Sequence, residues 1–196
     1  PRRLLRPEGL AVLTLIVLLP LLGFLLNGVL ATQLGGNRVG KTFVSVVGCG
    51  LPILAFGLAV KALLDLQAGG YVPLVETAYR WALIGRLPFE IAFYFDRLSA
   101  VMTLVVTGVG SVIHVYSVGY MAHDKSYGRF FAYLNLFLFF MLLLVLGRSL
   151  LVCFVGWEGV GLASYLLIGF WFEDPEKAAA VAEIAGRHLK KVVLEL

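Results

Sequence analysis

Five long apolar stretches most constrain what this chain can fold into. The hydrocarbon core of a bilayer is about 30 Å thick, and a helix needs about 20 apolar residues to cross it. Each stretch contains at most one charged residue. Because unpaired backbone groups are not tolerated in lipid, each is expected to be a transmembrane helix. The stretches are Leu10 to Leu30, Thr42 to about Ala62, Leu98 to Met121, Phe130 to Gly147, and Ser149 to Phe172.

The composition supports a membrane location and excludes several other classes. Of the 196 residues, 60% are hydrophobic and only 14% are charged, with a mean hydropathy of +0.93. A soluble domain of this length has too small a core to bury so much apolar surface. The net charge of +4 is spread between the apolar stretches, so no nucleic-acid partner is expected. The sequence therefore predicts an all-α, multi-pass membrane protein surrounded by lipid bilayer.

The connection between the second and third spans is long and patterned. The run Phe89 to Phe95 alternates with a period of two, and Arg80 to Ile84 can pair with it around Gly85 and Arg86. This pattern indicates a small extramembrane β-hairpin lying on the membrane surface. An irregular loop with aromatic anchors is the alternative.

The C-terminal residues differ in kind from the rest of the chain. Residues 1–172 form the predicted membrane domain, whereas residues 173–196 hold 9 of the 28 charges. Glu183, Arg187 and Lys191 are spaced for i, i+4 pairing on a helix, and an apolar face lies opposite them. We expect an atypical, amphipathic tail on the surface rather than a sixth span.

Glu158 is the strongest functional signal in the sequence. It lies about nine residues into the fifth span, roughly 13 Å along the helix axis. A carboxylate at that depth costs at least about 2.5 kcal/mol unless it is paired, hydrated or protonated. Tyr165 follows seven residues later on nearly the same face, while Gly156, Gly159 and Ala163 form a small-residue face that lets another helix approach closely. Glu158 is either a group that relays protons or ions, or a structural carboxyl that binds a neighbouring helix.

A second signal is a polar stripe on the third span. Thr107, Gly110, Ser111, His114 and Ser117 recur on one helical face, which must face other helices or trapped water. Histidine titrates near neutral pH, so His114 is a candidate for a proton path together with Tyr165. A packing histidine satisfied by a hydroxyl is the alternative.

The sequence carries no pattern of a soluble catalytic site. Its glycines lie in membrane spans rather than in a phosphate-binding loop, and Cys49 and Cys153 lie inside apolar runs without metal-ligand spacing. No cofactor and no metal are expected in this chain. Its activity is therefore expected to be translocation or a share in a larger assembly.

Several stretches together resemble one family. Gly156 to Phe172 (GWEGVGLASYLLIGFWF) resembles the fifth-helix signature of the L-type, chain 5, antiporter-like subunit of respiratory complex I. Val106 to Met121 and Tyr127 to Phe137 resemble the same family, as do the stretches that begin at Leu18 and Phe95. The resemblance covers roughly residues 10–180 and corresponds to the N-terminal part of such a subunit.

The resemblance implies a function and a site. It implies a proton-translocating membrane subunit of NADH:quinone oxidoreductase, coupled to quinone reduction elsewhere in the enzyme, with other membrane-arm subunits as partners. The membrane is then a bacterial inner membrane or an equivalent coupling membrane. Glu158 matches the family's proton-channel glutamate, whose partner in the family is a lysine on the seventh helix.

The chain departs from the family pattern in two places, and two rival functions stay open. The chain has Arg148 where the family usually has an acidic residue, and Val181 to Leu189 do not follow the usual pattern. We interpret the second departure as a break near Ala180 and expect this chain alone to be inactive. The rivals are an Mrp-type sodium/proton antiporter subunit, whose fifth-helix motif differs after the Trp-Glu pair, and a non-transporting membrane scaffold.

Overall fold

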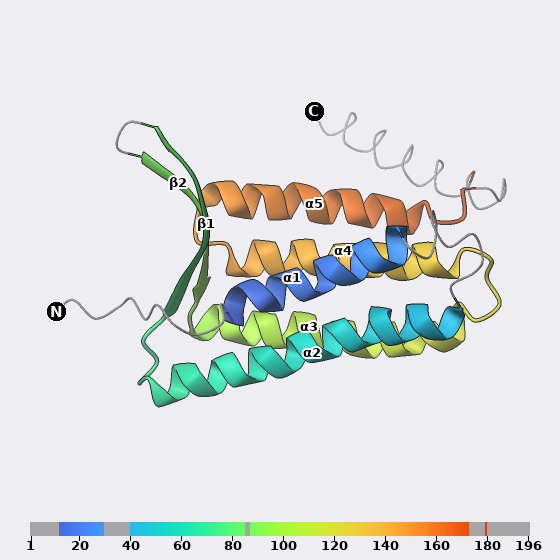
Figure 1. The fold of residues 1–196 in the computed structure, drawn as a ribbon, viewed down its shortest axis with the longest axis horizontal. Helices are drawn as coiled ribbons and strands as arrows, with labels where there is room; N and C mark the ends of the chain where they lie inside the picture. The colour runs from blue at the N-terminus through green and yellow to red at the C-terminus, as the bar shows by residue number, and fades with distance from the viewer. Residues whose placement is uncertain (1–11, 30–39, 85–86, 173–178, 180–196) are drawn as a thin grey trace, which may run out of the picture.

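The structure is a bundle of long helices with a β-hairpin across one end (Figure 1). This computed structural model describes residues 12–29, 40–84, 87–172 and 179. Within these residues five helices are long and apolar enough to cross a membrane, which confirms the predicted all-α membrane fold. The elements are α1 (Val12–Leu25), α2 (Lys41–Ala68), β1 (Leu74–Ile84), β2 (Leu87–Phe95), α3 (Arg97–Tyr120), α4 (Tyr127–Leu146) and α5 (Leu150–Ile168).

The largest difference from the predicted spans is at the end of α2. This helix runs to Ala68, six residues beyond the expected end at Ala62, and then the chain turns. Gly70 has a φ of 68°, a left-handed conformation that glycine adopts without steric cost. The fifth helix is shorter than expected, because it ends at Ile168 with Gly169 as its C-cap.

The predicted hairpin between α2 and α3 is confirmed and is longer than expected. β1 and β2 pair in antiparallel fashion from Leu74↔Phe95 to Ile84↔Leu87, with two irregularities in register. Only residues 85 and 86 connect the strands, a loop length typical of β-hairpins. The hairpin crosses the end of the bundle at which α1, α3 and α5 begin (Figure 1).

The hairpin also caps the first helix. The carboxylate of Glu76 on β1 accepts hydrogen bonds of 2.9 Å from the backbone amides of both Leu13 and Thr14, and another from the Thr14 hydroxyl. The first amides of a helix have no partner within the helix, and a carboxylate there also complements the helix dipole. Glu76 therefore fixes the start of α1 to the extramembrane hairpin.

Helix α3 begins at a capping box formed by Asp96 and Ser99. The Asp96 carboxylate accepts from the backbone amide of Ser99, and the Ser99 hydroxyl accepts from the Asp96 amide. The amide and hydroxyl of Ser99 donate to the carboxylate and hold the pKa of Asp96 below its usual range. A lowered pKa means that this stabilisation is present at neutral pH and is lost as acid protonates Asp96.

At the opposite end of the bundle, polar and aromatic contacts join four helices. Lys41 Nζ donates to the carbonyl of Ala122 at 2.6 Å, and Trp171 Nε1 donates to Asp124 at 3.1 Å. The guanidinium of Arg129 lies 5.0 Å from the ring centres of both Phe170 and Phe172. These contacts lie at the start of α4, so Arg129 is away from the middle of the spans.

The predicted amphipathic tail and the break near Ala180 lie outside the described residues. The boundary at residue 172 between a membrane domain and a tail therefore stays a prediction.

Candidate functional site

Glu158 lies in the middle of α5, the outermost helix of the bundle (Figure 1). It is the ninth of the 19 residues of this helix, about 12 Å along the axis from Leu150. Its side chain is exposed, and its exposed neighbours on the helix surface are apolar, including Phe154 and Leu162. Because α5 has the length and composition of a membrane span, this exposed surface lies at membrane depth.

The opposite face of α5 explains why Glu158 points outward. Gly156, Gly159 and Ala163 are buried against α4, as the small-residue pattern predicts. A Cβ atom at Gly156 would lie 2.6 Å from the backbone nitrogen of Leu144, so only glycine allows this approach. The close contact fixes the rotation of α5 and directs Glu158 away from α4.

The carboxylate of Glu158 has no partner in the described part of the chain. No hydrogen bond and no ion pair joins it to any of the residues that the structure places. An unpartnered carboxylate at membrane depth is costly, and such residues in membrane proteins face a water-filled cavity or pair with another polar group. Such a partner or water would lie on the outward face of α5.

Tyr165 shares this outward face. Its side chain is 73% exposed, and it lies two helical turns after Glu158, with Gly161 between them. The structure thus places Glu158 and Tyr165 on one surface, with open space above Gly161. A phenol and a carboxylate on one face can both exchange protons with a group that covers them.

His114 lies elsewhere, in the interior of the α1–α4 part of the bundle. It is 2% exposed, and its Nδ1 is 2.7 Å from the carbonyl of Gly110 one turn earlier. The predicted stripe on α3 is buried except for the half-buried Gly110, whereas the opposite face of α3 carries exposed valines. Because α4 lies between α3 and α5, the structure does not bring His114 together with Glu158 and Tyr165.

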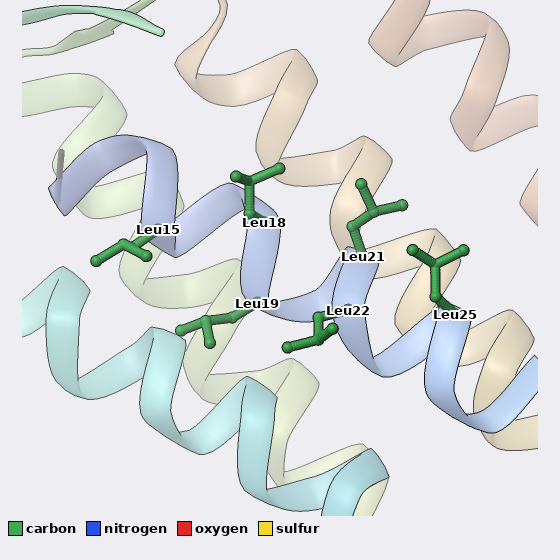
Figure 2. A pocket seen from close by; sticks show the side chains of 6 residues that line it. All are labelled: Leu15, Leu18, Leu19, Leu21, Leu22 and Leu25. Atoms are coloured by element: carbon green, nitrogen blue, oxygen red, sulfur yellow. The ribbon is translucent and has the colours of Figure 1, made fainter. Parts of the chain in front are cut away.

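An open apolar pocket on α1 does not belong to this site. It is lined by leucines of α1 alone, and Figure 2 shows that their side chains offer only carbon atoms. Such an apolar lining suits an acyl chain or an apolar helix face. Among the described residues, no group of three or more His, Cys, Asp or Glu side chains is placed to hold a metal ion.

Sequence reasoning missed how Arg148 is held at the head of α5. Its Nη1 lies 3.6 Å from Oε1 of Glu90 on β2, and its amide donates to the carbonyl of Ala92 at 2.9 Å. Gly147 also forms a β-bridge with Phe93. The turn between α4 and α5 is thus docked on the hairpin, and Glu90 supplies the negative charge opposite Arg148. The signal in the sequence was the acidic residue within the apolar alternation of β2.

We predict that a charge exchange tests this docking. Arg148→Glu places two carboxylates together and should lower the free energy of unfolding by about 0.2–1 kcal/mol, because the pair is partly exposed to solvent. The double variant Glu90→Arg with Arg148→Glu should recover most of the loss. Thermal unfolding in detergent micelles, followed by circular dichroism, measures both. If the loss of unfolding free energy in the double variant equals the sum of the losses in Glu90→Arg and Arg148→Glu alone, the two side chains are not coupled.

The fold and the intramembrane carboxylate define a multi-pass membrane protein with an ionisable membrane helix. Comparison with known protein families identifies the family within this class. Residues 81–131 match the family of the NADH-ubiquinone oxidoreductase (complex I) chain 5 N-terminus. Residues 147–185 match the transmembrane family of NADH:quinone oxidoreductase and Mrp antiporters, and this second match contains all of α5.

Individual relatives agree with the family matches. The chain is 44% identical over 168 residues to NADH-quinone oxidoreductase subunit L of Mycobacterium tuberculosis, and 42% identical over 168 residues to that of Escherichia coli. It is 42% identical over 160 residues to NADH-ubiquinone oxidoreductase chain 5 of Talaromyces marneffei. These alignments cover 85%, 86% and 82% of this chain but 26%, 27% and 23% of the relatives. The chain belongs to the subunit L, or chain 5, family, and it spans about a quarter of the length of these curated relatives.

Proposed function

We propose that this chain provides five N-terminal spans of a proton-translocating subunit of NADH:quinone oxidoreductase, in which Glu158 relays protons. The observation that carries the proposal is the exposed, unpartnered Glu158 carboxylate in the middle of α5. A group that alternately binds and releases a proton needs access to a proton donor and acceptor, which an outward face provides. The names of the relatives supply the enzyme in which this chemistry would operate.

The proposal assigns a role to each side of α5. The face of Gly156 and Gly159 holds the helix on α4, so that the helix does not rotate when the charge of Glu158 changes. The face of Glu158 and Tyr165 receives further helices of the subunit, and the family resemblance implies that one of them carries a lysine. The charge of that lysine would then set whether Glu158 holds or releases its proton. Other membrane-arm subunits are the proposed partners, and quinone reduction elsewhere in the enzyme is the proposed source of energy.

A sodium/proton antiporter subunit is the second candidate, because the family matched by residues 147–185 also includes Mrp antiporters. Membrane vesicles distinguish the two. A complete subunit L carrying residues 12–172 of this chain is assembled into the oxidoreductase, and the internal pH is followed with a fluorescent dye. We expect NADH to drive acidification equally well with and without sodium, and a sodium gradient alone to cause none. A pH change that a sodium gradient drives without NADH would overturn the proposal in favour of the antiporter.

A further inference from the structure

Three buried polar side chains from three helices lie in the interior of the bundle, each of them a neighbour of Gly48 or Phe131. Asn27 lies at the end of α1, in the π-helical residues 26–29, while His114 lies on α3 and Asn135 on α4. They are 0%, 2% and 0% exposed. We call these three residues the polar layer. It lies on the other side of α4 from the face that packs against α5, so it is separate from Glu158.

The contacts of these side chains place the polar layer around Gly48 of α2 and Phe131 of α4. The carbonyl of Gly48 accepts from Asn135 Nδ2 at 3.3 Å, and a Cβ atom at Gly48 would lie 3.1 Å from Asn27 Nδ2. The same Cβ atom would lie 2.6 Å from the ring of Phe131, whose centre is 6.3 Å from the centre of the His114 ring. Glycine at this position therefore leaves room for both amides and for the aromatic ring.

Several polar atoms of this layer have no hydrogen-bond partner among the described residues. They are both side-chain polar atoms of Asn27, Nε2 of His114 and Oδ1 of Asn135. All are buried, and a buried polar group without a partner is strongly unfavourable. The layer is thus incomplete as a network of protein atoms.

The direction of the existing hydrogen bonds defines what would complete it. Nδ1 of His114 faces a carbonyl oxygen and must donate, so Nε2 of the neutral ring is an acceptor. The amide nitrogen of Asn135 donates to the carbonyls of Gly48 and Phe131, which fixes its Oδ1 as a free acceptor. With Asn27 Oδ1 there are three free acceptors and a single free donor group, Asn27 Nδ2.

These side chains cannot satisfy one another, because acceptors outnumber donor groups. Water donates two hydrogen bonds and accepts two, and buried water typically binds such unsatisfied groups. A hard metal ion fits less well, since the polar layer has no carboxylate and includes the N–H donors of Asn27. We propose that Asn27, His114 and Asn135 form an internal water-binding site between α1, α2, α3 and α4.

Nuclear magnetic resonance of the whole chain in lipid bilayers tests this site. The sequence has only three asparagines, Asn27, Asn37 and Asn135, so labelling asparagine with ¹⁵N gives three side-chain amide signals. The variant Asn37→Gln removes one signal and assigns it. In solid-state spectra that select magnetisation from water protons, we expect the Asn27 and Asn135 amides to receive it at short mixing times. Magnetisation that reaches both amides only from lipid acyl protons would overturn the proposal.

A pair of variants on α3 extends the test. His114→Phe keeps an aromatic ring but removes the Nε2 acceptor, and we expect the transfer from water to Asn27 to fall at least twofold. Ser117→Ala is the matched control, because the Ser117 hydroxyl is buried on the same helix face but is bound to the carbonyl of Ile113. An equal fall in both variants would contradict the assignment of His114. The spectrum of the unsubstituted chain decides the proposal even if His114→Phe does not fold.

Discussion

Replacing Gly156 by alanine separates α5 from α4, and we expect it to lower the free energy of unfolding by about 2 kcal/mol. The added Cβ atom would lie 2.6 Å and 2.8 Å from backbone atoms of Leu144. Overpacking of this kind typically costs about 1–3 kcal/mol, and a backbone contact gives way less easily than a side chain. Alanine also favours the helix by about 1 kcal/mol relative to glycine, and that gain offsets only part of the cost.

The same helix offers a matched control for Gly156→Ala. A Cβ atom at Gly161 meets nothing within 4 Å, so Gly161→Ala has the gain in helix propensity without any clash. Gly159→Ala also clashes, since its Cβ atom would overlap Cδ1 and Cγ of the Phe140 ring. Unfolding of the full chain in detergent micelles, measured by circular dichroism, should rank Gly161→Ala as more stable than either Gly156→Ala or Gly159→Ala. Equal stability of Gly156→Ala and Gly161→Ala would show that α5 is not packed on α4 through this face.

The spans could be predicted from the sequence because the thickness of the bilayer sets their length. The hairpin could be predicted because a period of two is distinct from a helical period. The helical period also placed Glu158 and Tyr165 on one face of α5 and the glycines on another. Each of these inferences depends on residues that are close together along the chain.

What the sequence did not reveal are the contacts between distant segments. Glu76 caps α1 from more than sixty residues away, and Glu90 meets Arg148 across the end of the bundle. Periodicity gives the face on which His114 lies but not the helices that this face contacts. Only the three-dimensional arrangement shows that α4 separates α3, which carries His114, from α5, and that the His114 ring instead neighbours Phe131, which lies beside Gly48.

Glu158→Gln should have the largest effect on function. The amide is close to the carboxyl group in size and remains polar, so α5 keeps its packing on α4, but glutamine does not take up and release a proton. If Glu158 relays protons, the rate of proton movement through this subunit should fall by roughly 100-fold, as for other lost proton-transfer groups. NADH oxidation and the amount of assembled enzyme should change much less.

The substitution Glu158→Leu distinguishes a proton relay from a non-transporting scaffold. A scaffold gains from losing an unpaired charge in the membrane, so Glu158→Leu would then be neutral or stabilising and would leave proton movement unchanged. A relay loses its proton movement with leucine as well as with glutamine. Asp65→Asn on α2 is the control for removing an exposed carboxylate, since Asp65 lies away from α5 near the end of its helix.

The number of protons translocated per NADH oxidised tests the central claim most directly. It is measured in vesicles containing the complete oxidoreductase, whose subunit L carries residues 12–172 of this chain, at equal enzyme content. The account predicts a lower ratio for Glu158→Gln and an unchanged ratio for Asp65→Asn. An undiminished ratio for Glu158→Gln would contradict the role of Glu158 as a proton relay.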